Sequence, residues 1–150
     1  MSRRSVQHHG YRYRYETNDV DPNDRMGPLP DFALALIRRM LDLKLIFEET
    51  DQLTVNLYNP GAGIPPHVDT HSIFGEELIS LSLESDIVME FRHPKGLICP
   101  IPLPKRSIII LKGESRYIWR YTSFHRVLIV IEPPTPTRLF PLFLFHHLPN

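Results

Sequence analysis

The spacing of apolar residues changes from four to two close to residue 50, and few folds accommodate both patterns. Before the change, Phe32, Leu36 and Met40 recur every fourth residue, which predicts one amphipathic helix with Asp31 as its N-cap. After it, apolar and polar residues alternate over 53–58, which is typical of a strand with one buried face. The core is therefore expected to begin with a helix and to continue in strands.

Short strands separated by turns are expected for the rest of the core. The 15 prolines make up one residue in ten, about twice the usual share, which argues against a helical bundle. The run His93-Pro94-Lys95-Gly96 has proline and glycine at the positions that a tight hairpin turn requires. One helix followed by strands predicts an α+β protein whose sheets form a sandwich or barrel. The further strands are expected at 78–83, 87–91, 97–101 and 107–111.

The size and charge of the chain limit its class and its partners. The length of 150 residues corresponds to one domain with a single core. Because 17 basic residues balance 17 acidic ones, the net charge is zero, and any basic surface for nucleic acid has to be local. The single cysteine, Cys99, excludes an internal disulfide framework. There is no secretory signal and no apolar run long enough for a bilayer, so we expect a soluble protein without a membrane partner.

The composition divides the chain into three regions. Residues 1–28 are expected to form an edge strand and a loop, in which three tyrosines alternate with two arginines between residues 11 and 15. The same alternation could form a nucleic-acid surface, because rings stack on bases and guanidinium groups pair with phosphates. Residues 29–132 hold the helix and the strands. Residues 133–150 are proline-broken, apolar and without periodicity, so we expect a tail outside the core.

The sharpest chemical feature is the triplet His67-Val68-Asp69, which follows a loop. In extended backbone, residues two apart project to the same side, so the imidazole and the carboxylate can meet one ion. One imidazole and one carboxylate suit Fe(II), Mn(II) or Zn(II), and a second histidine would complete a facial triad with open positions. Such a triplet is also common as a coincidental surface pair. Here Asn56 and Tyr58 lie on one face of the strand before the loop, where both could hydrogen-bond a small organic acid.

The segment from Asn56 to Ser72, NLYNPGAGIPPHVDTHS, resembles the N-x-Y-x-P-G-x-G-I-P-x-H-x-D-T-H-S core of AlkB-type Fe(II)- and 2-oxoglutarate-dependent dioxygenases. Within that family it is most similar to members that act on the wobble uridine of tRNA. The resemblance covers most of residues 10–119. It implies a double-stranded β-helix, or jelly-roll, over residues 29–132, with one N-terminal helix packed on it and a C-terminally incomplete core.

The resemblance also implies roles for individual residues. His67 and Asp69 match the first two iron ligands, and Asn56 and Tyr58 match the residues that hold 2-oxoglutarate. The third ligand is not evident, because the histidine expected after Trp119 is absent.

Three readings of the third ligand remain. Tyr121 takes the place of the histidine, or His125 replaces it, or the ligand is missing. We favour the last reading, because Arg120 and Arg126 match the spacing of the arginines in the family's final strand, which bind the carboxylates of 2-oxoglutarate.

The function that the resemblance implies is hydroxylation of a modified nucleobase, a wobble uridine in tRNA, with Fe(II), 2-oxoglutarate and O2. The implied partners are nucleic acid and a protein that carries out a methyltransferase step, in the cytoplasm or the nucleus. Three alternatives remain: a demethylase of alkylated DNA or RNA bases, a catalytically impaired, truncated homologue that acts as a binding or regulatory protein, and a cupin-type metal protein with an unrelated substrate.

Overall fold

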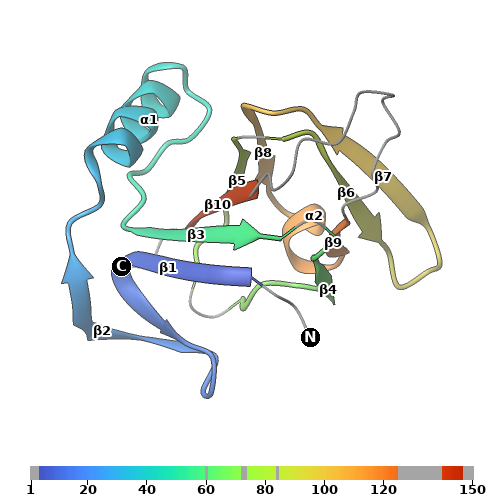
Figure 1. Ribbon diagram of the computed structural model, residues 1–150, viewed down its shortest axis with the longest axis horizontal. Helices are drawn as coiled ribbons and strands as arrows, with labels where there is room; N and C mark the ends of the chain where they lie inside the picture. Colours follow the sequence, from blue (N-terminus) through green and yellow to red (C-terminus); the bar gives the residue numbers. More distant parts are fainter. Residues whose placement is uncertain (1–3, 60, 72–73, 84, 125–139, 147–150) are drawn as a thin grey trace.

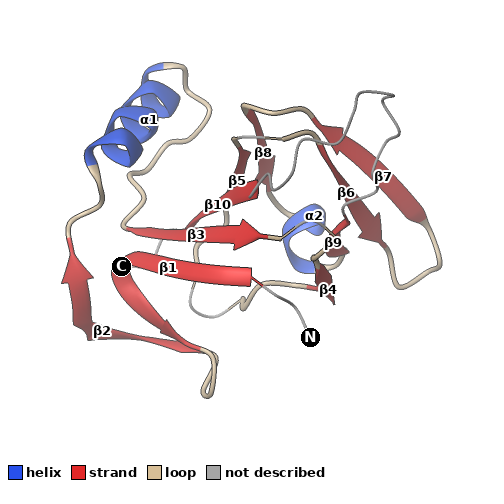
Figure 2. Cartoon of the chain, in the orientation of Figure 1, coloured by secondary structure: helices blue, strands red, loops and turns tan. Residues whose placement is uncertain are grey.

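The computed structural model describes residues 4–59, 61–71, 74–83, 85–124 and 140–146. Strands dominate these residues, and the helices α1 and α2 are short (Figure 2). The elements are β1 (Arg4–Arg14), β2 (Asp19–Gly27), α1 (Asp31–Asp42), β3 (Gln52–Tyr58), β4 (Ile64–His67), β5 (Leu78–Ser82), β6 (Ile87–Arg92), β7 (Ile98–Leu103), β8 (Ser107–Leu111), α2 (Glu114–Tyr117), β9 (Arg120–Phe124) and β10 (Phe140–His146).

The strands form two antiparallel sheets that face each other as a jelly-roll. The larger sheet has the order β2-β1-β3-β10-β5-β8, and the smaller has the order β4-β9-β6-β7 (Figure 1). Consecutive strands β3 and β4, and β5 and β6, thus lie in opposite sheets, as a double-stranded β-helix requires. The predicted α+β jelly-roll with a helix before it is confirmed.

Helix α1 covers the outer face of the larger sheet. Its buried residues Ala33, Ile37 and Met40 pack against Leu53 of β3 and Ile79 of β5 in one apolar cluster. The spacing of three and four between these helix residues produces a single buried stripe, as the sequence predicts.

The predicted N-cap of α1 is wrong by one residue. Pro30 is the N-cap, and Asp31 is the first helical residue, where its charge favours the helix dipole.

A second apolar cluster fills the space between the sheets. Tyr58 from β3 and Leu111 from β8 meet Met89 and Phe91 from β6 and Tyr121 from β9. Alternation along β3 explains the division, because Leu53 belongs to the outer cluster and Tyr58 to the inner one. The polar positions of β3 therefore face the interior of the roll.

The C-terminal part of the sheet differs from expectation in two ways. Residues 140–146 form β10 between β3 and β5, although we expected residues 133–150 to lie outside the core. A continuous apolar run without alternation is compatible with a central strand as well as with a tail. The prolines before it favour the tail in the sequence, and the structure shows the strand. Residues 120–124 form β9 of the smaller sheet, and β10 follows in the larger one, so the favoured match of this segment to a final strand is not supported.

The N-terminal region is a hairpin on the edge of the larger sheet. Strand β1 pairs with β3 and β2, and the pairing with β2 is irregular after Gly10. The turn at 93–96 closes as predicted, with the N–H of Gly96 donating to the carbonyl of His93 at 2.9 Å. Among the described residues, no helix has the length and apolar character needed to cross a membrane.

Candidate metal centre and adjoining pocket

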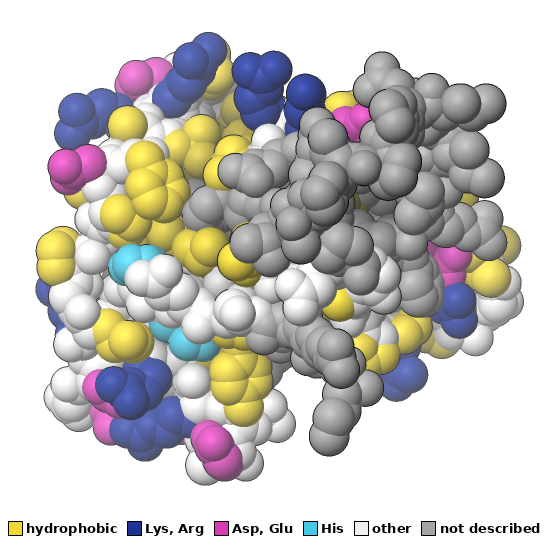
Figure 3. Space-filling model, viewed as in Figure 1, with side chains coloured by type: hydrophobic (Ala, Val, Ile, Leu, Met, Phe, Trp, Pro, Cys, Tyr) yellow, Lys and Arg dark blue, Asp and Glu magenta, His cyan; other side chains and the backbone are white. Residues whose placement is uncertain are grey.

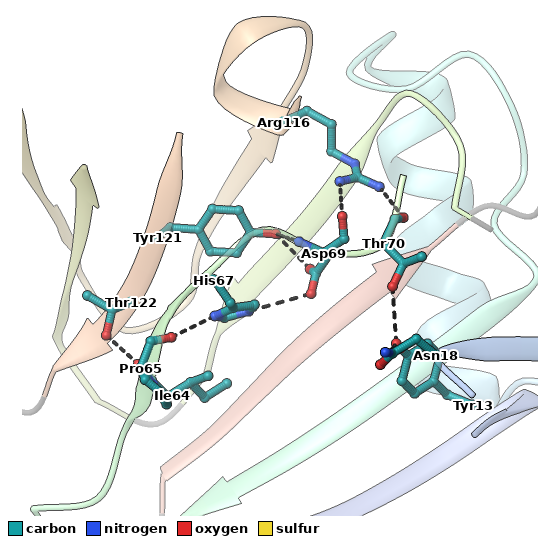
Figure 4. A network of polar contacts seen from close by, with 10 residues as sticks. All are labelled: Tyr13, Asn18, Ile64, Pro65, His67, Asp69, Thr70, Arg116, Tyr121 and Thr122. Atoms are coloured by element: carbon teal, nitrogen blue, oxygen red, sulfur yellow. Dashed lines mark hydrogen bonds and ion pairs between the residues drawn. The ribbon is translucent and has the colours of Figure 1, made fainter. Parts of the chain in front are cut away.

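His67 and Asp69 lie together at the end of β4, at the mouth of the roll (Figure 4). The Nε2 of His67 is 3.5 Å from Oδ1 of Asp69, a separation that one bound ion could bridge. On its other side, the Nδ1–H of His67 donates to the carbonyl oxygen of Pro65 at 2.9 Å. This bond fixes the ring and directs Nε2 toward the carboxylate, which is how a metal-binding histidine is oriented.

Tyr121 is the third side chain at this point. It is the cross-strand partner of His67 in the β4–β9 pair, and the ring centroids are 4.9 Å apart. Its hydroxyl donates to Oδ2 of Asp69 at 2.7 Å and accepts from the backbone N–H of Asp69 at 3.2 Å. Burial, and then the charge of Asp69, raise the pKa of the Tyr121 phenol far above its usual range, so the phenol is neutral.

Arg116 contacts the segment after β4 (Figure 4). This residue is fully buried and comes from α2. Its Nη1 donates to the carbonyl oxygen of Asp69 at 2.9 Å, and its Nη2 donates to that of Thr70 at 3.0 Å. The guanidinium therefore fixes two consecutive peptides next to the carboxylate.

A pocket of about 250 Å³ opens beside His67 and Asp69. Aromatic rings form one wall: Tyr13 stacks on Phe74 with centroids 5.7 Å apart and meets Tyr15 edge-on at 4.9 Å. The Tyr13 hydroxyl is also within hydrogen-bond distance of the Thr70 hydroxyl, at 3.1 Å, which ties the N-terminal hairpin to the segment after β4. The pocket is lined by His8, Tyr13, Tyr15, Asn18, Thr54, Asn56, Ile64, His67, Val68, Asp69, Thr70 and Phe74.

The predicted site residues do not all meet at this pocket. Asn56 is 1% exposed and lines it with His67 and Asp69, and Oδ1 of Asn56 accepts no hydrogen bond from the residues that the structure describes. Tyr58 lies deeper, in the inner apolar cluster with Tyr121. Arg120 is exposed on the smaller sheet, opposite Arg92 of β6, and does not line the pocket. Arg126 and His125 lie outside the described residues.

The donor set fits iron only in part. An imidazole nitrogen and a carboxylate oxygen are donors that Fe(II) takes. Within the described ranges, no group of three His, Cys, Asp or Glu side chains is placed to hold a metal. The third position next to His67 and Asp69 holds the phenol of Tyr121. Sequence reasoning offered Tyr121 as one of three readings but missed Arg116, because nothing in its neighbourhood marks it as buried.

Known proteins resemble this chain in sequence and in fold. The family model of the 2OG-Fe(II) oxygenase superfamily matches residues 1–127. A Xenopus tropicalis protein named tRNA (carboxymethyluridine(34)-5-O)-methyltransferase alkbh8 is 48% identical over 133 residues, which are 88% of this chain and 21% of that protein. An Arabidopsis thaliana protein named Alkylated DNA repair protein ALKBH8 homolog is 35% identical over 151 residues, 85% of this chain and 44% of that protein.

The chain thus spans less than half the length of these two relatives. Solved structures share the fold at low identity. OsALKBH1 has a TM-score of 0.64 at 13% identity, covering 97% of this chain and 80% of its own. A Pseudomonas putida prolyl-4-hydroxylase has a TM-score of 0.55 at 13% identity, covering 97% of this chain and 72% of its own.

Proposed function

Because the chain belongs to the 2-oxoglutarate- and Fe(II)-dependent oxygenase superfamily, we propose that it hydroxylates a modified nucleobase, a wobble uridine in tRNA. The single observation that carries this proposal is the pair of His67 and Asp69 beside an aromatic pocket. His67 and Asp69 would hold the iron, and Asn56 in the pocket, with Tyr58 behind it in the inner apolar cluster, would hold 2-oxoglutarate. When bound, iron with 2-oxoglutarate and O2 supplies the oxidation of a substrate C–H bond.

The pocket suits a planar base. Tyr13, Tyr15 and Phe74 present aromatic surface, and bases stack on aromatic side chains whatever their sequence. His67 and Asp69 line the same pocket, so a ring that stacks on these aromatic side chains would lie near the ion. Asn18 and Thr70 also line the pocket and supply polar groups for a bound base.

The choice of tRNA rests on relatives. A relative at 48% identity is named for carboxymethyluridine at position 34 of tRNA, but this chain corresponds to 21% of its length. From the same name we propose a protein partner for the methyltransferase step, and we place the enzyme where tRNA occurs, in the cytoplasm or the nucleus.

The test is an assay with the whole chain, Fe(II), 2-oxoglutarate and a tRNA anticodon stem-loop that carries a modified wobble uridine. We expect succinate release and a product that has gained one oxygen atom, measured by mass spectrometry. His67→Ala should remove both signals, whereas Arg38→Ala on the exposed face of α1 should retain them. Folded, iron-saturated protein that forms no succinate would contradict the proposal. Turnover only with N-methylated bases would favour the demethylase alternative.

A second candidate function is nucleic-acid binding without turnover. The position of Tyr121 favours it, because a phenol hydrogen-bonded to Asp69 occupies the place where a third ligand could lie. This candidate predicts that the metal-free chain binds the same stem-loop as tightly as the iron-loaded chain. It also predicts that Tyr13→Ala weakens this binding, because one stacking surface is lost.

A further inference from the structure

The contact between Tyr121 and Asp69 bears directly on how the centre takes a metal. The register of β4 with β9 places Tyr121 opposite His67, so both side chains lie on the same face of the smaller sheet. From there the phenol reaches over the segment after β4, and its oxygen lies 2.7 Å from Oδ2 of Asp69. Oδ1 of the same carboxylate faces His67 at 3.5 Å. The two oxygens of Asp69 therefore have different neighbours.

The hydroxyl of Tyr121 donates its single hydrogen bond to Asp69. A phenol has one donor, and here it points to Oδ2, while the backbone N–H of Asp69 donates back to the phenol oxygen. The ring is 1% exposed and lies between His67 and Phe91, whose centroids are 4.9 and 5.8 Å from its own. Because the ring is enclosed on both sides, it cannot turn away from Asp69 without repacking the inner apolar cluster.

Asp69 is held from the other side as well. Arg116 donates to the carbonyl oxygens of Asp69 and Thr70 and fixes the backbone that carries the carboxylate. Breaking the hydrogen bond between Tyr121 and Asp69 would therefore require a rearrangement of the packing around Tyr121 or of the backbone around Asp69. A metal that approaches His67 meets a carboxylate whose second oxygen is already engaged.

We propose that Tyr121 competes with a metal ion for Asp69, so that the centre takes a divalent cation through His67 and Asp69 alone and with an affinity that Tyr121 lowers. This inference rests on the proposed metal centre. Tyr121 is a positioning residue in it and not a ligand. A nitrogen at the same place would instead complete the facial triad, because it would lie beside both existing donors.

The experiment measures Ni(II) and Co(II) binding to the whole chain by isothermal titration calorimetry, with each metal alone as the probe. Tyr121→Phe removes only the hydroxyl and releases Oδ2 of Asp69, so we expect it to bind both metals about tenfold more tightly. Substitutions next to metal ligands change affinity by about this factor, although they usually lower it. Tyr121→His adds a donor, and we expect it to exceed the upper end of such effects, about 100-fold. Tyr11→Phe and Tyr11→His are matched controls, because Tyr11 lies on β1 beneath Arg25 and outside the pocket.

The possible outcomes separate this inference from the proposed function. Weaker binding by Tyr121→Phe than by the unaltered chain would show that the phenol supports the ion, as a ligand or by orienting Asp69, and would overturn the inference while retaining the metal centre. A visible charge-transfer band with Cu(II), lost in Tyr121→Phe, would do the same. If no variant binds metal, although circular dichroism shows each to be folded, the metal centre itself is refuted. Loss of binding on adding His67→Ala to Tyr121→His would place the ion at the predicted centre.

Discussion

At the scale of single residues, the buried polar groups around Asp69 explain how one loop peptide is kept in place. Arg116 is 0% exposed, and its Nε has no hydrogen-bond partner among the residues described, yet both of its terminal nitrogens donate to carbonyls. Burying a guanidinium is costly unless its donors are satisfied. The contacts with Asp69 and Thr70 thus offset the cost of its own burial and fix the candidate metal centre.

Replacing Arg116 by methionine should destabilise the protein by about 2 kcal/mol, because two buried carbonyl oxygens lose their donors. The free energy of unfolding in urea measures this effect. Arg38→Met is the matched control on the exposed face of α1 and should change stability by less than about 0.5 kcal/mol. Equal effects of the two substitutions would show that the buried contacts do not contribute.

The Tyr121 phenol should make stability depend on pH at the alkaline end. Its pKa is raised in the folded protein, so the folded state keeps the proton longer than the unfolded state. The contribution of the hydroxyl to the free energy of unfolding is therefore fully present below about pH 10, the ordinary pKa of tyrosine. It is lost as the pH rises toward the pKa of Tyr121 in the folded protein. The difference in unfolding free energy between the unaltered chain and Tyr121→Phe should shrink above about pH 10. A constant difference would contradict this account.

The candidate centre was predictable only where it depends on local spacing. His67 and Asp69 are two residues apart, and extended backbone alone brings them together. Tyr121 reaches them through the register of β4 with β9, which the sequence does not state. Arg120 was assigned to 2-oxoglutarate from a motif, but alternation along β9 directs it away from Tyr121, to the exposed face.

At the scale of elements, Gly10 lies where the register of β1 with β2 shifts. Its φ is +84°, and a Cβ at this position would meet the carbonyl oxygen of Asp51. The pairing of β1 with β2 becomes irregular immediately after it. Only glycine combines the backbone conformation with such a close approach.

Gly10→Ala should therefore lower the free energy of unfolding by more than about 2 kcal/mol, from backbone strain and from the contact with Asp51. Gly96→Ala is the matched comparison, because φ there is +89° with nothing within 4 Å of the added Cβ. Strain alone should cost about 1 kcal/mol at Gly96. The urea midpoints of the two variants measure the difference, and equal midpoints would show that the contact with Asp51 is relieved without cost.

Most strands were predictable because alternation is a local property, whereas β10 was not. The polar positions of β3, such as Asn56, face the roll and identify the strand from the sequence. In β10 the residues from Leu142 to Phe145 are all apolar, so their pattern does not distinguish a central strand from a disordered tail. Pairing with β3 and β5 decides the matter, and this pairing joins segments far apart in the chain.

At the scale of the whole molecule, charge is balanced overall, and ion pairs balance it on the N-terminal hairpin. The net charge is zero, and Figure 3 shows Lys and Arg side chains beside Asp and Glu on the visible face. On the N-terminal hairpin, Arg14 lies 2.8 Å from Asp21, and Arg12 lies 3.4 Å from Asp24. The two arginines that alternate with the tyrosines of β1 are thus already paired with carboxylates.

Binding of tRNA by this chain should therefore depend weakly on salt. Few phosphate contacts, about two, imply a loss of only about tenfold in affinity between 50 and 200 mM salt, roughly a hundredth or less of the loss for an extensively basic surface. Filter binding across this range measures the slope. Asp24→Asn should release Arg12 and steepen it, and a steep slope in the unaltered chain would show that the arginines leave their carboxylates on binding.

The place of β10 has a consequence for biosynthesis. On the ribosome, β3 and β5 emerge long before Phe140–His146, and until then each presents an open edge to the gap that β10 fills. The hydrogen bonds of β10 with β3 and β5 can form only after residues 140–146 have been translated. During that interval the nascent chain would need shielding, and a molecular chaperone that covers exposed strand edges would provide it.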